Sequence, residues 1–206
     1  MKFLIATHNS HKITEFKRIL EPLSIEVLTP KDLDINIDVV EDGTTFSENA
    51  KIKAKAFCKE SNCVSVADDS GICIDAFDGG PGIYSARFLG EDTPYTEKNA
   101  IILDRLKDTP DKKRTARYVC AICCVFPNGD VISTEGVCEG KIGYSPKGNN
   151  GFGYDPIFTV GDMSMAEMSD ADKDKISHRG IALEKFVSKL KNYIENKGKD
   201  EIDANK

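Results

Sequence analysis

The segment RYVCAICCVFPNGDVISTEGVCEGKI, residues 117–142, gives the clearest indication of how this chain folds. Two long β-rich runs, Arg117–Phe126 and Val131–Ile142, flank Pro127-Asn128-Gly129-Asp130, and Asn-Gly is the strongest short signal of a β-hairpin. We therefore expect two long antiparallel strands in this part of the protein.

Apolar patterns on both sides of this hairpin alternate between strand-like and helical. Strands are expected at 2–7, 25–28 and 64–67 and through Ile72 and Ile74; helices are expected from about Asn9 and over 45–60, 94–106 and 180–196. This order predicts a mixed α/β fold with a long, partly antiparallel sheet. Because no repeat, linker or composition break interrupts it, we expect one domain over 1–196 and a polar, frayed tail over 197–206.

Composition excludes several classes of protein. The net charge of −6 over 206 residues argues against a nucleic-acid-binding surface. No apolar run approaches the roughly 20 residues that a membrane helix needs. The N-terminal apolar stretch is too short for a signal peptide, which favours a cytoplasmic protein. The seven cysteines are odd in number and mostly lie in apolar runs, so we expect reduced core cysteines.

The first polar segment suited to chemistry is Thr7-His8-Asn9-Ser10-His11-Lys12, between a buried strand and a helix. Unpaired backbone N–H groups at a helix start, together with the Lys12 charge, favour a phosphate. The alternative is an ordinary helix cap by Asn9 or Ser10.

The second segment covers Glu41 to Lys53. Asn49 and Lys53 lie four residues apart on a helix, so they project together and could hold phosphate oxygens. Glu41, which precedes the helix, is a candidate metal ligand. The alternative is an acidic capping loop with a solvated helix face.

The third segment, Ala67-Asp68-Asp69-Ser70-Gly71, places adjacent carboxylates at the end of a buried strand. Carboxylates so placed repel each other unless a cation or hydrogen-bond donors intervene, and Mg²⁺ prefers such oxygens. A simple turn is the alternative.

Two further segments suggest a site for a flat ligand. In Gly151-Phe152-Gly153-Tyr154-Asp155-Pro156 the glycines let the backbone approach a ring on which Phe152 stacks; the alternative is a glycine-rich turn with core aromatics. In Ser177-His178-Arg179-Gly180, with Lys173 upstream, His178 and Arg179 could donate to a purine 6-oxo group. Surface decoration is the alternative for that pair.

Motifs of other nucleotide-binding and hydrolytic classes are absent from the sequence. It has no G-x-x-x-x-G-K-[ST], no G-x-G-x-x-G after a strand and no paired Cys or His spacing for zinc. None of the three histidines lies beside a nucleophile-elbow sequence, which argues against a serine hydrolase.

Taken together, the segments resemble the inosine triphosphate pyrophosphatase family, the RdgB-type dITP/XTP pyrophosphatases that remove non-standard purine nucleotides. The resemblance runs from Phe3 to about Leu190. Its most specific parts, in the family's order, are 45–50, 67–71, 81–87 (Pro-Gly-Ile-Tyr-Ser-Ala-Arg), 151–156 and 177–180.

The resemblance implies two α/β lobes around the long sheet with an active-site cleft between them, a homodimer, a Mg²⁺ requirement and a purine nucleoside triphosphate as substrate. By position, Asp69 would be the metal ligand and proton acceptor, Glu41 a further metal ligand and Ser70 a substrate contact. The remaining positions would hold the triphosphate (Thr7, His8, Asn9, Ser10, His11, Lys12, Asn49, Lys53) or surround the base and neighbouring groups (Phe152, Gly153, Tyr154, Asp155, Lys173, His178, Arg179).

One departure concerns the first loop. The family usually has Thr-Gly-Asn-x-Gly-Lys, whereas His8 and His11 occupy the two glycine positions here. Side chains there could limit how closely the backbone meets the phosphates, or could add donors.

The resulting hypothesis is attack of water at the α-phosphorus, with Asp69, or Asp68 beside it, taking the proton. Mg²⁺ would lower the pKa of that water, while Lys12 and Lys53 would stabilise the departing pyrophosphate. Two rivals remain: a Maf-type pyrophosphatase acting on other modified nucleotides, and a non-catalytic nucleotide-binding protein.

Overall fold

The computed structural model describes the backbone of residues 1–203 and the side chains of residues 1–197. The fold is mixed α/β, as predicted, with one eight-stranded sheet in the order β2-β1-β3-β5-β6-β7-β8 and β4 paired to β3. The strands are β1 Lys2–Ile5, β2 Glu26–Leu28, β3 Ser65–Ile74, β4 Gly80–Pro81, β5 Thr115–Val125, β6 Val131–Ile142, β7 Phe158–Val160 and β8 Met163–Ser164. The helices of the described part are α1 Ser10–Leu20, α2 Phe46–Ser61, α3 Tyr95–Arg105, α4 Asp170–Ile176 and α5 His178–Asp203.

The predicted hairpin is confirmed and forms the long axis of the sheet. Strands β5 and β6 pair antiparallel from Val125↔Val131 to Thr115↔Lys141. The connecting turn is closed by Phe126 N–H donating to the Asp130 carbonyl at 3.0 Å, and Gly129 has a φ of 91°, which suits glycine.

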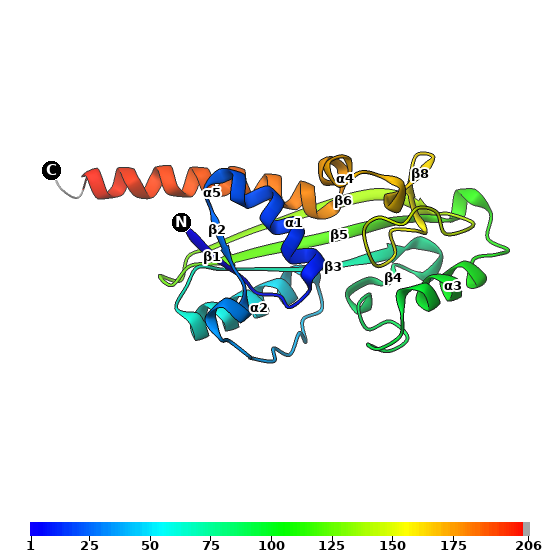
Figure 1. The fold of residues 1–206 in the computed structure, drawn as a ribbon, viewed down its shortest axis with the longest axis horizontal. Helices are drawn as coiled ribbons and strands as arrows, with labels where there is room; N and C mark the ends of the chain where they lie inside the picture. The colour runs from blue at the N-terminus through cyan, green and yellow to red at the C-terminus, as the bar shows by residue number, and fades with distance from the viewer. Residues whose placement is uncertain (204–206) are drawn as a thin grey trace.

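Three apolar clusters divide the molecule into two lobes. One cluster packs α1 and α5 on one face of the sheet, and another packs α2 on the opposite face (Figure 1). The third cluster joins the far ends of β3, β5 and β6 to α3 and to the segment around β7 and β8. The long strands therefore run through both lobes.

Between the lobes, part of one β3 edge carries no neighbouring strand. Parallel β1 pairs with β3 only as far as Val66, and antiparallel β4 pairs with β3 only from Cys73 onward. Among the described residues, no strand pairs with this edge between those two positions. This edge of β3 is therefore left without a strand partner beside Asp68, Asp69 and Ser70.

The acidic segment itself differs from the prediction. Two strands separated by residues 68–71 were expected, but β3 is continuous because β5 pairs with it from Ser65 to Ile74. Successive side chains of a strand point to opposite faces, so Asp68 and Asp69 lie on opposite sides of the sheet.

The last helix is longer than the sequence pattern indicates. It begins at His178, two residues before the predicted start, and continues to Asp203, through most of the segment predicted to fray. Its far end extends beyond the sheet (Figure 1). Residues 204–206 lie outside the described part. No helix among the described residues has the length and apolar character to span a membrane.

The cysteines behave as predicted. Five are buried (Cys58, Cys120, Cys123, Cys124 and Cys138), two are half-buried (Cys63 and Cys73), and all seven are free thiols. Burial raises the pKa of the Cys138 thiol to about 11, which keeps it protonated and unreactive.

Replacing Gly136 with alanine should lower the free energy of unfolding by about 1–3 kcal/mol, the usual effect of overpacking. A Cβ at Gly136 would overlap the His178 carbonyl oxygen and the Ala182 amide of α5, which are backbone atoms. Urea unfolding checks this. The control is Glu135→Ala at an exposed neighbouring position; equal unfolding free energies for the two variants would contradict the account.

Candidate active site

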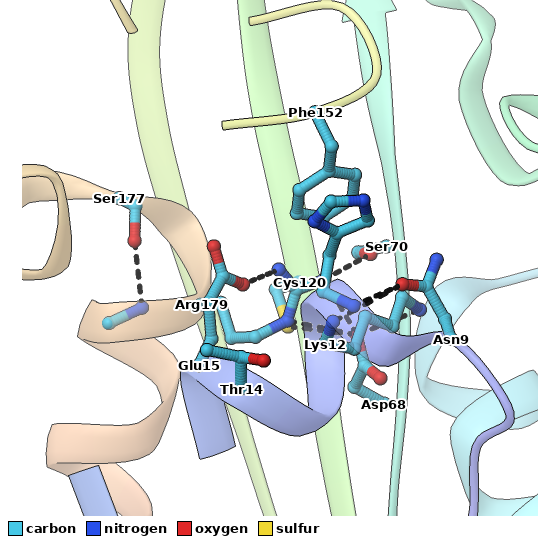
Figure 2. Close-up of polar contacts among 12 residues, drawn as sticks. Asn9, Lys12, Thr14, Glu15, Asp68, Ser70, Cys120, Phe152, Ser177 and Arg179 are labelled. Atoms are coloured by element: carbon cyan, nitrogen blue, oxygen red, sulfur yellow. Dashed lines mark hydrogen bonds and ion pairs between the residues drawn. The ribbon is translucent and has the colours of Figure 1, made fainter. Parts of the chain in front are cut away.

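A buried cluster of charges fills the sheet face beneath α1 and α5. Arg179, at the start of α5, donates from Nε and Nη2 to Asp68 at 3.2 and 2.9 Å and from Nη2 to the Ser70 hydroxyl at 2.9 Å. Its Nη1 donates to Glu15 of α1. Figure 2 shows Arg179 between Glu15 and Asp68, with Lys12 and Ser70 beside them. This guanidinium therefore ties α1, β3 and α5 together.

The neighbouring cations of this cluster keep the Asp68 carboxylate ionised. Burial alone would raise the pKa of Asp68, but Lys12 and Arg179 outweigh it and hold that pKa well below its ordinary value. Lys12 Nζ lies 3.0 Å from the Asp68 carboxylate. Asp68 is thus a buried, permanently ionised partner of two cations and a poor proton acceptor.

Lys173 extends the same network to the glycine-rich loop. Burial would lower the pKa of Lys173, but Asp155 and Glu15, at 2.8 and 3.2 Å, raise it above its ordinary value. Asp155 also accepts from Phe152 N–H at 2.8 Å. Lys173 therefore fixes the loop that presents Phe152.

The opposite face of β3 carries a separate polar group. Asn49 of α2 donates to Asp69 at 3.1 Å and accepts from Gly43 N–H at 2.8 Å. Lys53, one turn further along α2, pairs with Glu41 at 2.9 Å. Helix α2 begins with a capping box of Thr45 and Glu48, which fixes the position of Asn49.

Asp69 has the character of a proton acceptor. Burial raises the pKa of its carboxyl, and the neighbouring Glu41 adds to the rise, while Asn49 and Lys53 oppose it. A carboxyl with a raised pKa in a cleft is a better base than an ordinary aspartate.

The donor set on this face fits a magnesium ion. Asp69 and Glu41 offer hard carboxylate oxygens, and a cation between them would relieve their repulsion. No group of three or more His, Cys, Asp or Glu gathers at a possible metal site in the described part. Mg²⁺ commonly binds to one or two carboxylates, with water and substrate phosphates completing its shell.

The first loop, residues 7–12, contains the ordinary helix cap that was the alternative to a phosphate site. Asn9 caps α1, and its side-chain oxygen accepts from His11 N–H and Lys12 N–H at 3.0 and 3.2 Å. Two of the backbone donors expected to meet a phosphate are thus already bonded. Thr7 supports the turn by accepting from Asn9 N–H, and His8 and Ser10 are exposed.

One pocket gathers all seven residues predicted to surround a base, together with Ser70. Its predicted lining residues are Ser70, Phe152, Gly153, Tyr154, Asp155, Lys173, His178 and Arg179. The surface-decoration alternative is wrong for His178 and Arg179, which are only 6% and 2% exposed. The solvated-face alternative is also wrong for Asn49, which is 1% exposed.

His178 is a polar group of this pocket with spare hydrogen-bonding capacity. Its ring stacks on Tyr118 at 4.5 Å, and its buried Nδ1 has no hydrogen-bond partner among the described residues. Burial, with the charges of Arg179 and Lys173, holds the pKa of His178 well below its ordinary value, so the imidazole is neutral. A neutral imidazole can donate one N–H to a ligand carbonyl.

Stability should fall on acidification because of His178. Its folded-state pKa is lowered, so below about pH 6.5 the unfolded chain binds a proton that the folded protein does not. Between pH 7.5 and 5.5 this linkage should remove about 1.4 kcal/mol of unfolding free energy. Urea unfolding of the protein and of His178→Gln measures it; an equally large loss in His178→Gln would rule out His178 as the cause.

Several residues of the site were not predicted from the sequence. Glu15 reads as an ordinary helix residue, and the pocket residues Tyr95 and Tyr118 lie in segments that looked purely structural. Ser85 belongs to the 81–87 motif, to which no role was given. Glu15 lies about 100° around α1 from Phe16, outside the apolar stripe, so no sequence pattern pointed to its burial.

Comparison with known proteins shows similarity to one protein family along most of the chain. The model of the Ham1 family matches residues 3–189. A protein of Exiguobacterium sibiricum named dITP/XTP pyrophosphatase is 42% identical over 94% of this chain and 99% of its own length. One of the same name from Bacillus subtilis is 44% identical over 91% of this chain and 95% of its own.

Solved structures of related proteins superpose closely on this chain. The Ham1 protein of Staphylococcus aureus superposes with a TM-score of 0.84 at 37% identity, covering 94% of this chain and all of that one. A nucleoside-triphosphatase / dITP/XTP pyrophosphatase from Mycobacterium abscessus gives a TM-score of 0.72 at 39% identity, covering 90% of this chain and 98% of that one.

Proposed function

Because the chain belongs to the Ham1 family, we propose that it hydrolyses the triphosphates of deaminated purine nucleosides, ITP, dITP and XTP, to the monophosphate and pyrophosphate. Such an activity cleanses the nucleotide pool. The observation that carries the proposal is the arrangement along the middle of β3. There Asp69 lies on one sheet face beside Asn49, and Ser70 lies on the other face, in the lining of the Phe152–His178 pocket.

The reaction needs charge compensation at the triphosphate. A Mg²⁺ ion held by Asp69 and Glu41 would neutralise phosphate charge and lower the pKa of a bound water. The charges of the chain itself support this requirement, since four cations (Lys12, Lys53, Lys173, Arg179) face five carboxylates (Glu15, Glu41, Asp68, Asp69, Asp155) in and around the cleft. These nine side chains therefore offer no excess positive charge for a triphosphate.

The side chains of the protein have separate roles in proton transfer and in stabilising the leaving group. Asp69 accepts the proton of the water that attacks the α-phosphorus, and Asn49 orients its carboxylate. Lys12 and Lys53 stabilise the pyrophosphate as it leaves. Asp68 is excluded as the base by its two cationic partners, so the choice between the two aspartates falls on Asp69.

Base selection comes from the pocket. Hypoxanthine and xanthine present an acceptor at position 6, whereas adenine presents an amino donor. Arg179 already donates to Asp68, Glu15 and Ser70, so His178 is the better candidate for donating to the 6-oxo group. A site built around such a donor rejects the analogue that lacks the acceptor by several powers of ten in favourable cases.

Pyrophosphate release from ITP, dITP, XTP, GTP and ATP, each with Mg²⁺ and with a chelator, tests the proposal. We expect metal-dependent release from ITP, dITP and XTP far above that from ATP and GTP. ATP lacks the 6-oxo acceptor, whereas GTP carries it and must be rejected at its 2-position. Activity only on modified pyrimidine nucleotides would favour a Maf-type enzyme. Binding of ITP without release would favour a non-catalytic nucleotide-binding protein.

A homodimer, implied by the family resemblance, and the cytoplasmic location expected from the sequence complete the proposal. Sedimentation equilibrium at micromolar concentration should give twice the mass of the chain. A monomer mass at all concentrations would remove the dimer from the proposal.

A further inference from the structure

The ring on which a base would stack is already covered by a side chain of the phosphate loop. His11 and Phe152 stack with ring centroids 4.9 Å apart and planes inclined by 13°. Two rings in such contact leave no room for a third between them. A purine can therefore use this face of Phe152 only after His11 has moved away.

The two partners of the stack differ in how firmly they are held. Phe152 lies in a loop fixed by Asp155 accepting from Phe152 N–H, by Asn99 donating to the Gly153 carbonyl at 3.1 Å and by Lys173 pairing with Asp155. Gly151 has a φ of 71°, and a Cβ there would overlap the Asp155 carboxylate, so the loop backbone is closely packed. His11 is exposed on the first turn of α1. His11 is thus the movable partner.

Covering Phe152 has a clear physical benefit in the free protein. An aromatic ring without a partner exposes apolar surface to water, and a stacked imidazole shields it. The same contact competes with a ligand base for that surface. Where the family pattern has glycine, no side chain could compete.

We propose that His11 is a stacking gate: it covers the base-binding face of Phe152 in the free protein and must swing away before a purine binds. The inference rests on the proposed function, because it assumes that a purine stacks on the face of Phe152 that His11 covers. It assigns His11 a role in the base site, in place of the phosphate contact expected from its position in the loop.

The gate predicts that removing the imidazole strengthens nucleotide binding. An aromatic pair contributes about 0.5–1.5 kcal/mol, so His11→Ala should lower the Kd of a non-hydrolysable α,β-methylene ITP about two- to tenfold. His11→Phe keeps the stack and should not show this gain. Inorganic triphosphate, which has no base, should bind the protein and the His11→Ala variant equally well.

A direct readout is available because the chain has only three histidines. The ring current of Phe152 should shift the carbon-bound imidazole protons of His11 upfield in the proton NMR spectrum, and Phe152→Ala should remove the shift. Adding the methylene analogue should move the His11 signals to positions typical of an exposed imidazole, while inorganic triphosphate should leave them in place.

Two results would overturn the gate. If His11→Ala and His11→Phe both weaken the analogue and inorganic triphosphate alike, His11 is a phosphate ligand. If the His11 signals keep their upfield shift with the analogue bound, the base does not use this face of Phe152. Neither result touches the proposed function, which fails separately if the unaltered protein releases no pyrophosphate from ITP.

Discussion

Replacing Asp69 with asparagine should lower kcat for ITP hydrolysis by at least about a hundredfold, the usual contribution of a positioned general base. Asparagine has nearly the same shape but cannot accept the proton. The raised pKa of Asp69 also predicts that the activity of the unaltered protein rises with pH through that pKa, because only the ionised carboxylate is a base. Steady-state kinetics with ITP at several pH values measures both effects.

The fold of this variant should be retained. The asparagine side chain still has an oxygen that can accept from Ser70 N–H. The favourable hydrogen bond from Asn49 is lost. Urea unfolding should therefore give a free energy within about 1–2 kcal/mol of the unaltered protein. Near-normal turnover by Asp69→Asn would remove this residue from the mechanism.

Replacing Arg179 with methionine should reduce the free energy of unfolding by roughly 3–5 kcal/mol, because it leaves buried carboxylates without their main partner. Arg179 contacts Asp68, Glu15 and Ser70, and its side chain is 3% exposed. Its raised pKa, which burial opposes and Asp68 drives, indicates how strongly the charged form is held. Urea unfolding measures the loss.

Arg117→Met is the matched control. Arg117 also contacts two carboxylates, Asp75 and Glu139, but its side chain is 36% exposed. Solvent screens such pairs, so this variant should lose at most about 1 kcal/mol. Equal losses for the two variants would mean that the buried network contributes no more than a surface ion pair.

The parts of the fold that the sequence predicts well are those fixed by local pattern. The Asn128-Gly129 turn between two β-rich runs indicates the hairpin directly, and the apolar stripe of α2 indicates that helix. The continuity of β3 could not be predicted this way. Asp68 and Asp69 look like a turn, and only the long pairing of β3 with β5 keeps them extended.

For the site, too, local sequence motifs identify the residues but not their contacts. Motifs single out residues 152–155, Lys173, His178 and Arg179, and in the structure these residues line one pocket. The assignment of roles depends on contacts that no motif contains. Arg179 looks like a ligand for the base but is a buried partner of Asp68 and Glu15, and Asn49 orients Asp69. The stack of His11 on Phe152 joins residues 141 positions apart and is visible only in the folded chain.

The most direct test of the proposed reaction is the fate of the attacking oxygen. ITP should be hydrolysed in ¹⁸O-labelled water with Mg²⁺ present. The products should then be separated and their ¹⁸O content measured by mass spectrometry. Attack at the α-phosphorus predicts IMP carrying one ¹⁸O and unlabelled pyrophosphate. Label in pyrophosphate, or formation of IDP and inorganic phosphate, would contradict it.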